Sequence, residues 1–342
     1  MELQITWFIL WAVLWAVYFM LDGFSLGMGM LFGILGKNQT DRRMLLQTVG
    51  PVWNGNEVWL VTAGGATFAA FPTTYALMFS YLYTALLLLL FALIIRGVSL
   101  EFRSKADTLR WRSLCDLAIV VSSFLPALLF GVAFGNIFGG LPMDQAGYHG
   151  SFISLLNPYG LLTGALFVLL FAVHGALYVS VKTAGSLSDR GHKTASRLWP
   201  WLLVVAVVFL GASKFATRLF DNYLQWPVLA LIPLIAVAAL IAIRYFAAKG
   251  ELLMAFAASC VTILFVTFTG VAGLFPSLIP SSIDPAFNLT IFNSSSSQYT
   301  LGVMTVVAFI FVPIVIAYKI WVYRVFRARV EEKDVLANTE SY

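Results

Sequence analysis

Long apolar runs recur through this chain, and their length constrains its fold more than any other feature. An α-helix needs about 20 apolar residues to cross the hydrocarbon core of a bilayer, and several runs reach that length. Charged residues make up only 11% of the 342 residues, under half of the share that soluble domains carry. We therefore predict an all-α polytopic membrane protein that forms a single membrane domain over residues 1–342.

The apolar runs divide into nine predicted transmembrane helices. They cover residues 7–35, 50–71, 74–97, 114–138, 158–183, 198–216, 227–247, 253–275 and 299–323. Lys and Arg are concentrated in every second connection and in the C-terminal tail, and Arg96 is assigned to the basic loop after the third helix. Because cytoplasmic segments are enriched in Lys and Arg, we place the N-terminus outside and the C-terminus in the cytoplasm. The net charge of +5 then reflects orientation, and no nucleic-acid partner is expected.

The first and fifth predicted helices share a weak internal similarity. Asp22-Gly23 and Gly33 match His174-Gly175 and Gly185 at one constant offset. Internal repeats of this kind occur in other membrane folds. We therefore expect two parallel four-helix units, residues 1–150 and 151–280. Residues 281–342 would add an outer loop, a peripheral ninth helix and a cytoplasmic tail.

Small residues at a spacing of four mark places where membrane helices come into close contact. The first and fourth predicted helices carry such pairs, and the second carries an adjacent pair of glycines. The candidate helix or subunit contacts are Gly23, Gly27, Gly64, Gly65, Gly131 and Gly135.

Three polar residues lie where they are costly inside a bilayer, which makes them functional candidates. Asp22 is about 15 residues, or roughly 23 Å, into the first helix. It can share a hydrogen bond at a helix contact, relay protons, or make an ionic contact to a partner protein. Glu57 lies near the start of the second helix, where the helix dipole or a proton pathway can account for it. Asn54 is one turn earlier, on the same face. It can cap the helix or line a polar path.

The sequence offers little for a metal or haem site. Of the three histidines, only His174 falls within a predicted helix, and a six-coordinate haem needs two opposed ligands. Cys115 and Cys260 have no metal-binding spacing and are not expected to form a disulfide. We predict no metal site and no catalytic group that acts within this chain alone.

Six ordered blocks carry a resemblance to a known family. They cover residues 21–27, 53–66, 102–105, 131–136, 156–162 and 296–301. In these blocks, and over nearly its full length, the chain resembles subunit II of the cytochrome bd quinol oxidases.

The resemblance implies a terminal oxidase of a bacterial or archaeal plasma membrane, which oxidises quinol and reduces oxygen to water. Two b haems and haem d would lie in subunit I. This chain would bind none, stabilise subunit I and shape cytoplasmic proton access. Membrane lipid, quinone and a small single-helix subunit are further candidate partners. Asn54 replaces the acid of the family's Trp-Asp-Gly-Asn motif, so Glu57 is the candidate replacement.

A proton-coupled secondary transporter is the alternative from another class, with Asp22 and Glu57 as coupling groups. Transporters of this kind have broken helices at matching places in both repeats. Pro126 and Pro233 do not occupy matching positions in the two units, which disfavours this alternative.

The predicted orientation places residues 98–113 in the cytoplasm and residues 139–157 outside. A membrane-impermeant thiol reagent added to whole cells should therefore modify Ser151→Cys and spare Ser104→Cys, each as the single cysteine. The reverse labelling pattern would overturn the topology.

Overall fold

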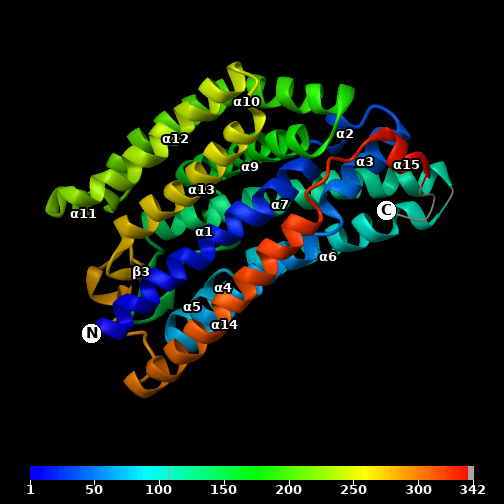
Figure 1. Ribbon diagram of the computed structural model, residues 1–342. Helices are drawn as coiled ribbons and strands as arrows, with labels where there is room; N and C mark the ends of the chain where they lie inside the picture. The colour runs from blue at the N-terminus through cyan, green and yellow to red at the C-terminus, as the bar shows by residue number, and fades with distance from the viewer. Residues whose placement is uncertain (107, 338–342) are drawn as a thin grey trace.

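The structure is a computed structural model, and it describes residues 1–106 and 108–337. Nine long helices dominate these residues (Figure 1). They are α1 (Glu2–Met30), α4 (Trp53–Ala70), α6 (Tyr83–Phe102), α7 (Leu109–Gly139), α9 (Pro158–Lys182), α10 (Gly185–Ala216), α12 (Leu231–Ala248), α13 (Leu252–Leu274) and α14 (Gln298–Val325).

Shorter elements connect them. The short helices are α2 (Phe32–Leu35), α3 (Gln39–Val49), α5 (Pro72–Tyr81), α8 (Phe152–Leu155), α11 (Leu219–Gln225) and α15 (Glu332–Ala337). Strands β1 (Met143–Asp144) and β2 (Gly147–Tyr148) pair antiparallel, as do β3 (Ser277–Ile279) and β4 (Leu289–Thr290). The 3-10 turns are η1 (Arg103–Lys105), η2 (Pro227–Ala230) and η3 (Pro285–Phe287).

Eight helices in the described part of the chain are long and apolar enough to cross a membrane. They are the long helices other than α4. This helix coincides with the second predicted span and has 18 residues, but Asn54, Asn56 and Glu57 make its first turns polar. The third predicted span is divided at Leu82 into α5 and α6. The fold is therefore a predominantly helical membrane bundle.

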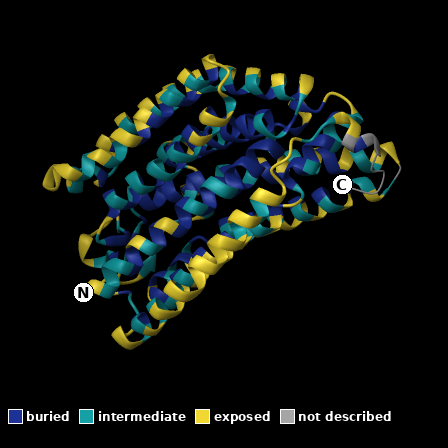
Figure 2. Cartoon of the chain, in the orientation of Figure 1, coloured by how far each residue is buried: buried dark blue, intermediate teal, exposed yellow. Residues whose placement is uncertain are grey.

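Helices α1, α7 and α9 form the buried centre of the bundle (Figure 2). Their apolar faces meet through aromatic rings packed edge to face. The ring centroid of Phe19 lies 5.4 Å from that of Phe134 and 5.1 Å from that of Phe167. Such pairs contribute about 0.5–1.5 kcal/mol each beyond the area that they bury.

Helices α1 and α9 come close because glycines lie at their contact. A Cβ added to Gly27 would lie 1.8 Å from the Phe171 carbonyl oxygen, and one on Gly175 would lie 2.3 Å from the Met28 nitrogen. Only hydrogen at these positions lets the backbones approach so closely. These two helices begin the two predicted four-helix units, and that division remains a prediction.

The other candidate glycines fall into two groups. A Cβ on Gly23 would meet the Phe171 ring at 2.8 Å, and Cβ atoms on Gly131 and Gly135 would meet Thr163 of α9 at 2.5 and 2.7 Å. A Cβ on Gly64 or Gly65 would meet nothing within 4 Å. Four of the six glycines thus pack against α9, and the two in α4 face open space.

Helix α14 lies on the outside of the bundle, as expected for a peripheral ninth helix (Figures 1 and 2). In the most apolar 18-residue stretch of α14, only 6% of the residues are buried inside the chain, compared with 72% in that of α9.

Beyond α14 the chain turns back across the bundle end that carries α3 (Figure 1). We call residues 326–330 the C-terminal strap. The Lys182 ammonium donates hydrogen bonds to the carbonyls of Phe326 and Ala328, and Val330 forms a β-bridge with Thr183. The strap thereby joins the end of the chain to the end of α9.

Candidate functional site

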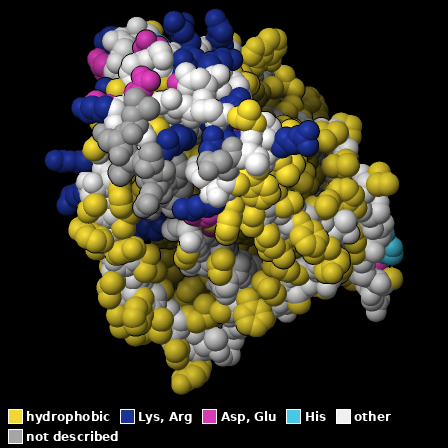
Figure 3. Space-filling view, turned by 90° about the vertical axis from the view of Figure 1, so that its right-hand side faces the viewer, with side chains coloured by type: hydrophobic (Ala, Val, Ile, Leu, Met, Phe, Trp, Pro, Cys, Tyr) yellow, Lys and Arg dark blue, Asp and Glu magenta, His cyan; other side chains and the backbone are white. Residues whose placement is uncertain are grey.

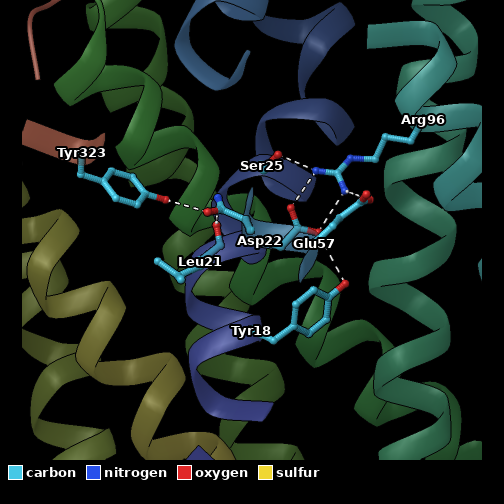
Figure 4. Close-up of polar contacts among 8 residues, drawn as sticks. Tyr18, Leu21, Asp22, Ser25, Glu57, Arg96 and Tyr323 are labelled. Atoms are coloured by element: carbon cyan, nitrogen blue, oxygen red, sulfur yellow. Dashed lines mark hydrogen bonds and ion pairs between the residues drawn. The ribbon is translucent and has the colours of Figure 1, made fainter. Parts of the chain in front are cut away.

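A buried ion-pair cluster lies between α1, α4 and α6 (Figure 4). Tyr18, Asp22 and Ser25 recur on one face of α1, at a spacing of three to four residues. Arg96 reaches this face from α6. Its guanidinium donates to Asp22 Oδ1 at 2.9 Å and to Asp22 Oδ2 at 3.0 Å. The same guanidinium donates to Ser25 Oγ at 2.5 Å and to Glu57 Oε1 at 3.0 Å.

Arg96 corrects the prediction from sequence. The sequence places it in the loop after the third span, whereas it lies within α6 and its side chain is 1% exposed. A guanidinium remains charged in proteins, and so it can be buried only where acids pair with it. Asp22 and Glu57 are those acids. Two unexplained carboxylates at one depth of the bundle were the signal for a buried cation.

Asp22 and Glu57 differ in their surroundings. The Asp22 side chain is fully buried, both of its oxygens accept from Arg96, and the Tyr18 hydroxyl lies 3.5 Å from Oδ2. The Glu57 side chain is 22% exposed and accepts one bond, from Arg96. Asp22 is therefore fixed by its contacts, whereas Glu57 keeps access to its surroundings.

Asn56 extends the cluster toward α14. Its amide nitrogen donates to the Leu21 carbonyl at 2.8 Å, and its oxygen accepts from the Tyr323 hydroxyl at 2.9 Å (Figure 4). Asn54 is exposed and has no side-chain hydrogen bond to this cluster among the described residues. The polar partner of α1 on this helix is thus Asn56 and not Asn54.

The charges do not cancel within the cluster. Asp22 and Glu57 bring two carboxylates to a single guanidinium. Asp22 accepts two hydrogen bonds from Arg96, whereas Glu57 accepts one and keeps part of its side chain exposed. Of the two acids, Glu57 is therefore held by fewer contacts.

A second ion-pair network holds the end of the bundle near α3. Asp116 of α7 accepts from Arg103 and, at 2.6 Å, from Arg42, while Asp41 pairs with Arg190 of α10 at 2.7 Å. From the sequence, these arginines are expected to be charges of the connecting loops only. They attach α3 to α7 and α10, which is a structural role.

His174 does not fit an axial haem ligand. Nδ1 lies 2.6 Å from Ser259 Oγ, and Nε2 lies 3.0 Å from the Met20 carbonyl oxygen. The imidazole is also stacked on Phe256, with 4.8 Å between ring centroids. Both nitrogens are engaged, so neither is available to iron. Among the described residues, no three His, Cys, Asp or Glu side chains are grouped as a metal site.

Comparison with known proteins decides the family. The sequence model described as "Cytochrome bd terminal oxidase subunit II" matches residues 3–326. The chain belongs to the cytochrome bd terminal oxidase subunit II family. The "Cytochrome bd-I ubiquinol oxidase subunit 2" of Escherichia coli (strain K12) is 36% identical over 374 residues, covering 99% of this chain and 98% of the relative. The "Cytochrome bd ubiquinol oxidase subunit 2" of Bacillus subtilis (strain 168) is 37% identical over 336 residues, covering 97% of this chain and 98% of the relative.

A solved structure shares the fold of this family member. A chain of "The structure of bd oxidase from Geobacillus thermodenitrificans" superposes with a TM-score of 0.79 at 17% identity, covering 95% of this chain and 99% of that chain.

Membership in the subunit II family has direct consequences. The recognition made from the six sequence blocks is confirmed, and the transporter alternative is not favoured. The chain is a multi-pass plasma-membrane subunit of an oxidoreductase complex that contains haem, and a subunit II implies a subunit I partner.

Removing Arg96 should destabilise the subunit strongly. Arg96→Met would leave Asp22 buried without its cation, and breaking a buried pair in this way costs about 3–5 kcal/mol. Arg96→Lys should recover only part of the lost stability, because an ammonium cannot reproduce the bidentate contact with Asp22. Thermal unfolding and the yield of assembled complex measure both variants.

Glu57→Gln is the matched control, since it removes a partly exposed carboxylate and leaves Arg96 paired with Asp22. An Arg96→Met complex as stable as the Glu57→Gln complex would contradict the structural importance of the pair.

Proposed function

We propose that this chain is the haem-free subunit of a quinol oxidase that reduces oxygen to water. Two b haems and haem d would lie in subunit I, and this chain would stabilise that subunit and shape proton access from the cytoplasm. The observation that carries the proposal is the partly exposed Glu57 beside the saturated Arg96–Asp22 pair. The engagement of both His174 nitrogens supports the absence of haem ligation by this chain.

We propose a nine-span topology with α4 as the second span, the N-terminus outside and the C-terminus in the cytoplasm. Lys and Arg side chains gather over the end of the molecule that carries α3 and α15, which supports the cytoplasmic placement of that end (Figure 3). Asp22 and Glu57 would then lie in the cytoplasmic half of the bundle, where protons for oxygen reduction would arrive.

The surface for subunit I includes α4 in this proposal. Gly23, Gly27, Gly131 and Gly135 already pack against α9, whereas Gly64 of α4 has open space beside it and Gly65 lines a groove between α1, α4 and α14. A small-residue patch without a neighbour in its own chain suits close approach by a helix of a partner. Asn54, exposed on the same helix, would lie toward that partner. A single-helix subunit, quinone and lipid remain further candidate partners.

Expression without subunit I tests the haem-free role. The isolated chain should bind no haem and oxidise no quinol, because its only membrane-embedded histidine is fully engaged. The complex purified with subunit I should show haem bands in a reduced-minus-oxidised spectrum. Stoichiometric haem in the isolated chain would refute the proposal.

Glu57→Gln tests the proton pathway. The amide keeps the size of the side chain but cannot exchange protons, so quinol-driven oxygen uptake should fall roughly tenfold. Haem content, read from the same spectrum, should remain at the wild-type level. Asn54→Asp in the Glu57→Gln background should restore part of the rate by returning an acid one turn away.

Asp22→Asn is the matched comparison. Because Asp22 is held by Arg96, we expect this variant to lower assembly and haem retention rather than turnover per haem.

For Glu57→Gln, a rate of oxygen uptake equal to that of the wild type across the pH range would exclude Glu57 from the pathway.

A further inference from the structure

Helix α14 is fastened to the bundle at its two ends and stands away from it between them. Near its start, the Trp7 indole N–H donates to the Leu301 carbonyl at 3.2 Å and to Thr305 Oγ1 at 3.0 Å. Near its end, Tyr323 bonds to Asn56. Between these contacts lies a groove of about 1040 Å³, bounded by α1, α4 and α14.

The walls of the groove are apolar over most of its length. Leu10, Val13 and Val17 of α1 line one side, and Val307, Phe311 and Val315 of α14 line the other. From Trp7 to Leu21 the α1 wall spans roughly 21 Å, which exceeds one leaflet of a hydrocarbon core about 30 Å thick. Such walls offer no hydrogen bonds to water or to a polar ligand, and hydrocarbon chains fit them.

The end of the groove toward the C-terminus of α14 is basic. Lys319, Tyr323 and Arg324 line the groove from the last turns of α14, and Arg327 lines it from the C-terminal strap. Lys319 extends over α4, since a Cβ on Gly55 would lie 2.3 Å from its ammonium nitrogen. Among the described residues, Lys319, Arg324 and Arg327 have no acid within ion-pair distance.

We propose that this groove binds an anionic phospholipid. Its phosphodiester would lie at Lys319, Arg324 and Arg327, and its acyl chains would fill the space between α14 and the bundle. Unpaired cations beside a bilayer attract anionic headgroups, and long basic side chains reach toward that level. A neutral quinone would bring no negative charge to these three cations. The lipid would then be part of the packing of α14.

Titration of the purified complex with subunit I tests the proposal. The complex is stripped of lipid and supplied with phosphatidylglycerol or with phosphatidylcholine of the same chains, and bound lipid is counted by native mass spectrometry. The wild-type complex should bind phosphatidylglycerol more tightly than phosphatidylcholine. Replacing Lys319, Arg324 and Arg327 together by Gln should weaken phosphatidylglycerol binding roughly a hundredfold.

The matched charge control replaces three exposed cations outside the groove, namely Lys105, Arg110 and Lys193, by Gln. It should bind phosphatidylglycerol as the wild type does. Equal affinities of the wild type for the two lipids, or unchanged binding by the groove variant, would overturn the proposal.

A second pair of variants tests where the acyl chains of the phospholipid bind. Ala308→Phe places a ring in the groove and should displace the phospholipid. Val306→Phe, on the exposed side of the same helix turn, should not. If Ala308→Phe retains the phospholipid, or if it displaces a co-purified quinone instead, the proposed occupant is wrong.

Discussion

The contact of Arg96 with Asp22 determines how three helices meet. A guanidinium and a carboxylate that are both buried can remain so only while they face each other, since either one alone would be an uncompensated charge. That requirement fixes the rotation of α6 relative to α1. Glu57 then brings α4 to the same guanidinium, and Asn56 connects α4 to α14 through Tyr323. Arg96 thereby organises the polar contacts among α1, α4 and α6, and Asn56 extends them to α14.

The opposite face of α1 is constrained by size instead of charge. Gly27 and Gly175 bring α1 and α9 so close that a methyl group on either would collide with backbone. Helix α1 is therefore held from one side by an ion pair and from the other by glycine packing. A helix fixed on two faces has little freedom to rotate, so Asp22 and Glu57 keep their separate environments.

The sequence was sufficient for the features that depend on composition and local spacing. Apolar length predicted the membrane bundle, and the cost of acids in a bilayer identified Asp22 and Glu57. The sequence could not identify contacts between residues that are far apart in the chain. Arg96 lies 74 residues from Asp22, and its burial depends on the register between two helices. The same limit applies to Gly23, Gly27, Gly131 and Gly135, whose shared neighbour α9 follows from packing geometry alone.

Asn54 illustrates a related limit. Helical spacing correctly puts it one turn from Glu57, but a helix face is wide enough that one residue turns inward and the other toward the surface. Asn56, the residue before Glu57, lies on a different face of α4 and makes the contacts to α1 and α14. Which side of a polar helix is inside depends on the neighbours, and local spacing does not contain that information.

The C-terminal strap has a consequence for how the chain is completed. Lys182 and its partner Phe326 are 144 residues apart, so their contact forms only after the last helix has been synthesised. The central helices can pack before that point, because none of their mutual contacts involves the strap. The end of the bundle that carries α3 is therefore closed last, and a chain that stops before Phe326 would lose this cover together with Val335 of α15, which is fully buried in the main core.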